Sequence, residues 1–123
     1  MLIVETFVAP SSIHGLGLFA AKHIASGTKM WELNTNANII LTEPQLEQLH
    51  PVARAKIKHH SYINKDGLII LSFDGAQYIN HSEDPNMMDQ DYNCYALRDI
   101  AAGEEITANY YASELKAEQK LNR

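Results

Sequence analysis

Short apolar runs, broken by tight turns, set the pattern of hydrophobic and polar positions along this chain of 123 residues. The runs are rich in β-branched, aromatic and aliphatic residues and are bounded by turn-forming residues, a pattern that predicts strands. Lys65-Asp66-Gly67 is typical of a hairpin turn. Many short strands predict a mostly β domain with helices on one side. The predicted strands cover residues 2–8, 28–33, 39–41, 68–71, 92–100 and 105–110.

Two short helices are predicted in the middle of the chain. The segment Thr42–Gln45 has Thr as the expected N-cap and Gln three residues later, which is a capping box. Pro51 is expected at the first position of the second helix. Val52 and Ala55 share one face of that helix, so we expect this face to turn inward and Arg54 to point outward.

Composition and charge narrow the class of protein. The apolar share of 46% and the charged share of 20% are ordinary for a globular domain with one core. A net charge of −5 argues against direct nucleic-acid binding, which needs a basic face, and is compatible with a basic peptide as partner or simply with solubility. The single Cys94 excludes an intrachain disulfide framework and a Cys-rich zinc site.

The sequence predicts no targeting or membrane segment. No apolar stretch approaches the ~18 residues that a membrane span needs. Residues 1–10 lack the basic start of a signal peptide, and Glu5 interrupts their apolar run. We therefore expect a cytoplasmic protein, or a nuclear one if it acts in a eukaryotic host.

Candidate chemistry is concentrated at Asn80-His81-Ser82. These three residues place an amide, an imidazole and a hydroxyl in consecutive positions, and Asp84-Pro85-Asn86 then predicts a turn. Polar groups held at the end of a strand are a common way to build a binding site. The imidazole of His81 could act as a general base, but a buried histidine with structural hydrogen bonds is the commoner case.

Two other motifs are weaker candidates for a functional site. Gly15-Leu16-Gly17-Leu18-Phe19-Ala20 has the letters of a dinucleotide-binding fingerprint, but residues 10–14 separate it from the preceding strand and Ser26-Gly27 breaks the chain soon after. His59 and His60 are adjacent on a helix and point in different directions, which favours a solvated helix end over a metal site. We therefore predict neither a dinucleotide site nor a metal site.

Four motifs, taken in order, resemble the SET domain, the fold of S-adenosylmethionine-dependent protein-lysine methyltransferases. The resemblance spans about residues 2–111, and the small size is similar to SET-only proteins of viruses and bacteria. The motifs are His14–Ala20, Ser61-Tyr62 with Lys65-Asp66-Gly67, Tyr78–Ser82 with Pro85-Asn86, and Arg98–Ile100 followed by Gly103–Thr107 and Tyr110.

The resemblance implies a single SET domain over residues 1–123. Its fold would be mostly β, a β-clip-like arrangement of several small sheets. The C-terminal segment would pass under the loop after Asn80-His81, forming a pseudoknot. A helical insertion is expected at about residues 34–76, and a short C-terminal helix at residues 112–123.

The resemblance also implies methyl transfer from S-adenosylmethionine to the lysine of a protein or peptide, with no metal. Tyr110 would be the catalytic residue, with Tyr111 as its competitor, and spacing from Gly103 selects Tyr110. A homodimer is a further expectation, because the domain is small and lacks its own cap. The implied cofactor-binding residues are His14, Gly15, Leu16, Gly17, Tyr62, Asn80 and His81. The implied substrate channel comprises Leu33, Tyr78, Tyr95 and Ala108.

Two departures from the family pattern keep other functions open. Leu33 stands where many members carry a channel tyrosine, and Ala108 stands where a bulky residue is frequent. A non-catalytic binding module that keeps the fold, and with it the cofactor, is the second hypothesis. A β-rich structural protein that binds no cofactor is the third.

Overall fold

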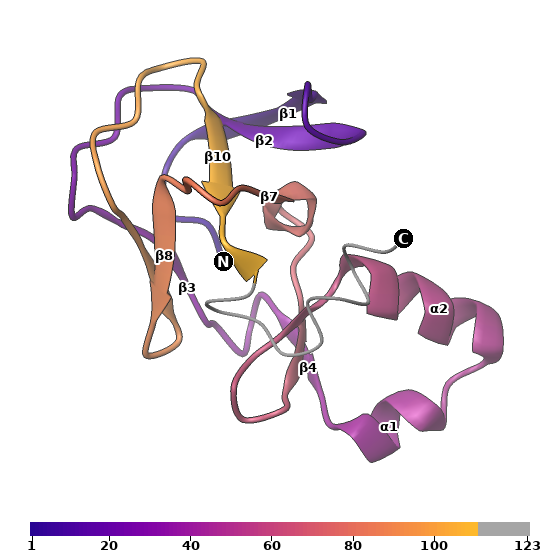
Figure 1. Cartoon of the computed structure of the whole chain (residues 1–123). Coiled ribbons are helices and arrows are strands. Elements are labelled where there is room, and N and C mark those ends of the chain that lie inside the picture. The colour runs from indigo at the N-terminus through magenta and orange to yellow at the C-terminus, as the bar shows by residue number, and fades with distance from the viewer. Residues whose placement is uncertain (111–123) are drawn as a thin grey trace.

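Two curled β-sheets and two short helices make up residues 1–110, the part of the chain that this computed structural model describes (Figure 1). The predicted mostly β class is confirmed. The helix predicted at residues 112–123 lies outside the described residues. The strands are β1 (Thr6–Pro10), β2 (Leu16–Ala20), β3 (Lys29–Glu32), β4 (Ile39–Leu41), β5 (Tyr62–Ile63), β6 (Ile69–Leu71), β7 (Asn80–His81), β8 (Met87–Gln90), β9 (Asn93–Ala96) and β10 (Glu105–Ala108). The helices are α1 (Glu43–Glu47), α2 (Pro51–His60) and the 3₁₀ turn η1 (Ala76–Tyr78).

The larger sheet has the strand order β1-β2-β10-β8-β9-β3, and β7 also pairs with β10. The smaller sheet has the order β4-β6-β5. Both helices and the whole smaller sheet fall between residues 34 and 76, and the helices lie to one side of the larger sheet (Figure 1). The β5–β6 pair is antiparallel around the turn predicted at Lys65-Asp66-Gly67.

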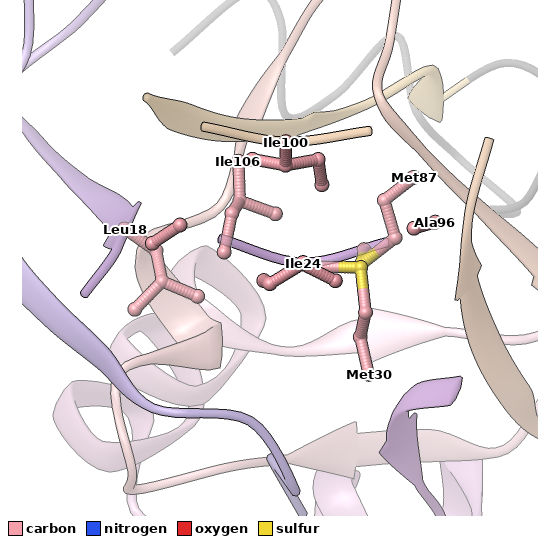
Figure 2. Close-up of a cluster of buried hydrophobic side chains, with 8 residues drawn as sticks. Leu18, Ile24, Met30, Met87, Ala96, Ile100 and Ile106 are labelled. Atoms are coloured by element: carbon pink, nitrogen blue, oxygen red, sulfur yellow. The ribbon is translucent and has the colours of Figure 1, made fainter. Parts of the chain in front are cut away.

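The core lies within the larger sheet and the loops that cross it. Figure 2 shows that its side chains come from β2, β3, β8, β9 and β10 and from the connections around residues 24 and 100. Burial of such side chains is the main favourable term in folding. The cluster consists of Leu18, Ala20, Ile24, Met30, Met87, Ala96, Ile100 and Ile106.

The C-terminal strand β10 is the central connection of the fold. It runs antiparallel to β2 and parallel to β7 and β8. Asn86, in the loop that follows β7, donates its amide to Glu105 O (2.8 Å) and accepts from Thr107 N (2.9 Å). The C-terminal segment therefore lies against the loop after Asn80-His81, as the resemblance implied.

Two predicted strands have other bounds in the structure, and two observed strands were not predicted. The strand predicted at 92–100 is limited to β9, because Asp91 and Tyr92 adopt φ values of 50° and 65° and form the turn of the β8–β9 hairpin. The strand predicted at 2–8 begins only at Thr6. Strands β2 and β8 were missed, because a glycine in β2 and an aspartate in β8 interrupt the apolar pattern.

The helix starts were predicted correctly, but the inward face of α2 was not. The Thr42 side chain accepts from Gln45 N (3.3 Å) and Gln45 Oε1 accepts from Thr42 N (2.9 Å), which is the predicted capping box. Val52 is 59% exposed, whereas the half-buried residues of α2 are Arg54, Ile57 and His60. This face, which carries one arginine and one histidine, turns His60 toward the site described next.

Candidate functional site

Tyr110 is held firmly where β7 and β10 meet. Its hydroxyl donates to Ile79 O (2.6 Å), and its backbone N–H donates to His81 Nδ1 (3.1 Å). The rings of Tyr110 and His81 are 5.3 Å apart at an angle of 61°. Tyr110 is only 6% exposed, so both its ring and its hydroxyl have a defined position. The imidazole of His81 has a structural role here, which agrees with the commoner case expected from the sequence.

Asn80 joins the N-terminal glycine motif to the larger sheet. Its amide nitrogen lies 3.1 Å from both His14 O and Leu16 O and 3.0 Å from Glu105 Oε2. Asn80 is 3% exposed, so these hydrogen bonds compensate the burial of its amide. The side chain therefore fixes the loop around Gly15 beside β7.

Glycine occupies positions 15 and 17 of the motif for different structural reasons. Gly15 has φ of +47°, in the left-handed region that favours glycine, and open space surrounds its missing side chain. Gly17 lies in a strand, and a Cβ there would come 2.5 Å from Glu105 Oε2. Packing against Glu105 thus accounts for Gly17, whereas the close approach of a cofactor to these glycines stays a prediction.

A first hollow opens beside the glycine loop, and we call it the Gly-loop hollow. The predicted cofactor residues His14, Gly15, Leu16 and Asn80 line it together. Tyr78, predicted for the substrate channel, lines this hollow instead of the one that contains Tyr110.

A second hollow contains Tyr110, and we call it the Tyr110 hollow. It adjoins the Gly-loop hollow, because His60, Gln77 and Ile79 line both. The rest of its wall includes Trp31, Tyr62, Asp89, Cys94, Ala108 and Tyr110.

The structure brings some predicted residues to this second hollow and leaves others out. Ala108 lines it, as predicted for the channel, and Tyr62 lines it rather than the Gly-loop hollow. Tyr95 lines neither, because its neighbour Cys94 faces the hollow and adjacent strand residues point to opposite faces. Leu33 also lines neither, and its backbone N–H donates to Tyr92 O at the hairpin turn.

Sequence reasoning missed most residues that line the Tyr110 hollow, among them Trp31, His60, Gln77 and Asp89. His60 was interpreted as part of a solvated helix end, yet it is half-buried and its ring lies 5.9 Å from the Tyr78 ring. The side chain of Gln77 accepts from Gly75 N (2.8 Å) within the η1 turn. No local sequence pattern marks these residues, because contacts distant in the chain bring them together.

Asp89 is the carboxylate in the wall of the Tyr110 hollow. The Tyr62 hydroxyl donates a hydrogen bond to Asp89 Oδ2. Burial is the main cause that raises the pKa of the Asp89 carboxyl, and the Tyr62 hydrogen bond opposes the rise. Burial, followed by the charge of Asp89, raises the pKa of the neighbouring Cys94 thiol to about 12. The thiol is therefore neutral, and Asp89 supplies the negative charge.

Residues 1–110 contain neither a cluster of metal ligands nor a helix that could span a membrane. Within them, no group of three or more His, Cys, Asp or Glu side chains is arranged to hold a metal ion. Their helices are too short and too polar to cross a membrane.

Comparison with known proteins identifies the fold family. The family model described as the SET domain matches residues 15–111. A search of curated protein sequences found no match. A candidate histone methyltransferase of Plasmodium falciparum is similar in structure, with a TM-score of 0.60 and 20% identity, covering 87% of this chain and 93% of the other.

Two structures of the Polycomb Repressive Complex 2 of Chaetomium thermophilum are also similar. A humanized mutant bound to an inhibitor has a TM-score of 0.68 and 22% identity over 94% of this chain. The complex in an autoinhibited conformation, bound to S-adenosylmethionine, has a TM-score of 0.68 and 21% identity over 97% of this chain. This chain spans only 16% of the length of either matched chain. At these identities the likeness shows a shared fold.

Proposed function

The chain belongs to the SET domain family, and from that membership we propose that it is a protein-lysine N-methyltransferase, which moves a methyl group from S-adenosylmethionine to a lysine side-chain amine. One observation carries the proposal. The hollow beside the glycine loop and the hollow around Tyr110 share the lining residues His60, Gln77 and Ile79, so a methyl donor in the first and an amine in the second would lie on opposite sides of these residues.

The Gly-loop hollow suits the proposed cofactor. Gly15 leaves open space at the loop, and the loop backbone is held in place by the Asn80 amide nitrogen. That leaves the Asn80 Oδ1 oxygen as the group of this side chain that can accept from a cofactor amine. The bound cofactor would supply a methyl group on a sulfonium. Binding of S-adenosylmethionine by the Chaetomium complex supports this assignment by analogy within the shared fold.

The Tyr110 hollow suits the amine. A free lysine has a pKa of ~10.4, so it must lose a proton before it can attack. Apolar side chains, among them Ile70, Ile79 and Met87, form part of the wall around the amine. The Tyr110 hydroxyl lines this hollow, and its hydrogen bond to Ile79 O fixes the position of its oxygen. That oxygen would orient the amine and stabilise the positive charge that develops on it.

The test begins with cofactor binding. Thermal unfolding is measured with and without S-adenosylmethionine, and a ligand at a hundred times its dissociation constant should stabilise the fold by ~2.7 kcal/mol. Methyl transfer is then measured with labelled cofactor on core histones and on a degenerate lysine-peptide library. The absence of both binding and transfer would overturn the proposal.

Tyr110→Phe separates chemistry from binding. The variant should lose most methyl transfer and keep the stabilisation by cofactor, because Tyr110 lies outside the Gly-loop hollow. Tyr95→Phe is the matched control, since Tyr95 lines neither hollow, and it should behave as the wild type. Full transfer by Tyr110→Phe would remove this hydroxyl from the mechanism.

A non-catalytic module that binds S-adenosylmethionine is the second candidate. It is favoured by one observation: Leu33, at the position of the family's frequent channel tyrosine, lines neither hollow. Mass spectrometry separates the two candidates. Methylated lysine on any added protein, or on this chain itself, excludes the non-catalytic alternative, whereas cofactor binding without any methylated product supports it.

A further inference from the structure

The wall of the Tyr110 hollow combines a carboxylate with aromatic rings. Asp89 reaches the hollow from β8, and the Tyr62 hydroxyl orients its carboxylate. Trp31, Tyr62 and Tyr110 line the same hollow with their rings. Aromatic faces attract cations, and a carboxylate makes its strongest hydrogen bonds with charged donors. The combination is suited to a positively charged amine.

Trp31 contributes an aromatic ring to the hollow beside Asp89. The residue is 6% exposed, and its indole nitrogen is buried, with no hydrogen-bond acceptor within the part of the chain that the structure describes. The ring, and not the buried N–H, is therefore the group that Trp31 offers to a cation.

Negative charge continues from Asp89 toward the surface. Trp31, Tyr62 and Asp89 also line a neighbouring hollow whose wall includes Asp66, Asp91 and Lys65, so with Asp89 this wall carries three acidic side chains and one basic side chain. Of the residues lining the Tyr110 hollow itself, Asp89 is the one carboxylate among those that the structure describes. A cation that approaches through the acidic neighbouring hollow would therefore meet Asp89 next to Tyr110.

We infer that Asp89 captures the ammonium form of the acceptor lysine in the Tyr110 hollow, with the surrounding rings as a cation-binding wall. The inference rests on the proposed function and deepens it, because it names the residue that selects a cationic side chain. After capture, the ammonium group passes its proton to solvent water, and the neutral amine then attacks the methyl group. Asp89 therefore acts on the bound ground state, and its removal should raise KM without lowering kcat.

A binding experiment tests the inference without methyl transfer. The probe is n-butylammonium, which reproduces the end of a lysine side chain, and n-butanol is its neutral counterpart. Both are titrated into ¹⁵N-labelled protein and followed by NMR chemical shifts. Wild-type protein should bind n-butylammonium, and Asp89→Asn, which keeps an oxygen for Tyr62, should bind it about tenfold more weakly. Binding of n-butanol should be the same in both proteins.

Asp84→Asn is the matched control. It removes the same charge from the loop that precedes β8, but Asp84 is exposed, pairs with Arg98 at 3.6 Å and lines neither the Tyr110 hollow nor its acidic neighbour. It should bind n-butylammonium as the wild type does. Equal affinity of wild type and Asp89→Asn, or no binding by the wild type, would overturn the inference.

Kinetics separates this inference from the proposed function. If the wild type transfers methyl groups, Asp89→Asn should raise KM for a lysine peptide about tenfold, with kcat not reduced and stabilisation by S-adenosylmethionine unchanged. An unchanged KM would refute the role of Asp89 and leave the methyltransferase intact. A wild type that binds n-butylammonium but never transfers a methyl group would instead support the cation site and refute the enzyme.

Discussion

Replacing Asn86 with alanine should be among the most damaging single substitutions outside the hydrophobic core. Asn86 is 1% exposed and lies in the loop between β7 and β8. Its amide nitrogen donates to Glu105 O (2.8 Å) and Glu104 Oε2 (2.9 Å), and its Oδ1 accepts from Thr107 N (2.9 Å). These contacts attach β10 to the loop, and β10 leads directly to Tyr110.

The magnitude follows from the groups left without partners. Alanine removes the acceptor of Thr107 N and the donor to Glu105 O, two backbone groups next to a side chain that is fully buried. Each unsatisfied buried group costs roughly 1–3 kcal/mol. Water can rehydrate part of the space, so we expect a loss of about 3 kcal/mol in the free energy of unfolding. Since whole domains are stable by about 5–15 kcal/mol, this loss is large.

Equilibrium unfolding in urea measures the loss, with Asn93→Ala as control. Asn93 also donates its side-chain amide, but to Asp91 O alone at 3.1 Å and at an exposed turn. We expect the control to cost less than about 1 kcal/mol. Equal losses in the two variants would show that Asn86 does not hold β10, and the account of how Tyr110 is positioned would fail with it.

Two further predictions concern ionisable groups in the Tyr110 hollow. The pKa of Asp89 is raised in the fold, so its charge costs stability as pH rises through the folded pKa. Asp89→Asn should therefore unfold at a higher temperature than the wild type at pH 7, and calorimetry at pH 3, below the unfolded pKa of ~3.9, should find the difference gone. A difference that is constant with pH would contradict this. The Cys94 thiol, with a pKa of about 12, should resist iodoacetamide at pH 8 in the folded protein and react quickly in denaturant, as followed by mass spectrometry.

Features set by local backbone geometry could be predicted from the sequence. The capping box of Thr42 and Gln45 needs only residues three apart, and both of its hydrogen bonds are present. The hairpin at residues 65–67 likewise depends on local turn chemistry, and Gly67 has the positive φ, +81°, that such a turn uses. In each case the residues that specify the element are the residues that form it.

Features set by tertiary contacts could not be predicted. The sequence predicted Val52 as an inward-facing residue of α2. In the structure the inward face of α2 instead carries Ile57 and His60, because this face lies against the η1 turn and His60 lines both hollows. Asp89 broke the apolar alternation of β8, although it faces inward to Tyr62. A charged residue on an inward face is the kind of exception that a functional site produces.

The motifs that resemble the SET family predicted the fold correctly for a different reason, which the contacts of Glu105 illustrate. Its carboxylate accepts from the Ser11 hydroxyl (2.7 Å) and from the Asn80 amide (3.0 Å), and it occupies the space that a side chain at residue 17 would need. Three motifs that are far apart in sequence therefore meet at a single side chain. Their joint presence is informative because a change at Gly17, Asn80 or Glu105 would disturb the other two. Asp89 and Trp31 lie outside these contacts of Gly17, Asn80 and Glu105, so the cation-binding role proposed for them can be tested by substitution without disturbing this network.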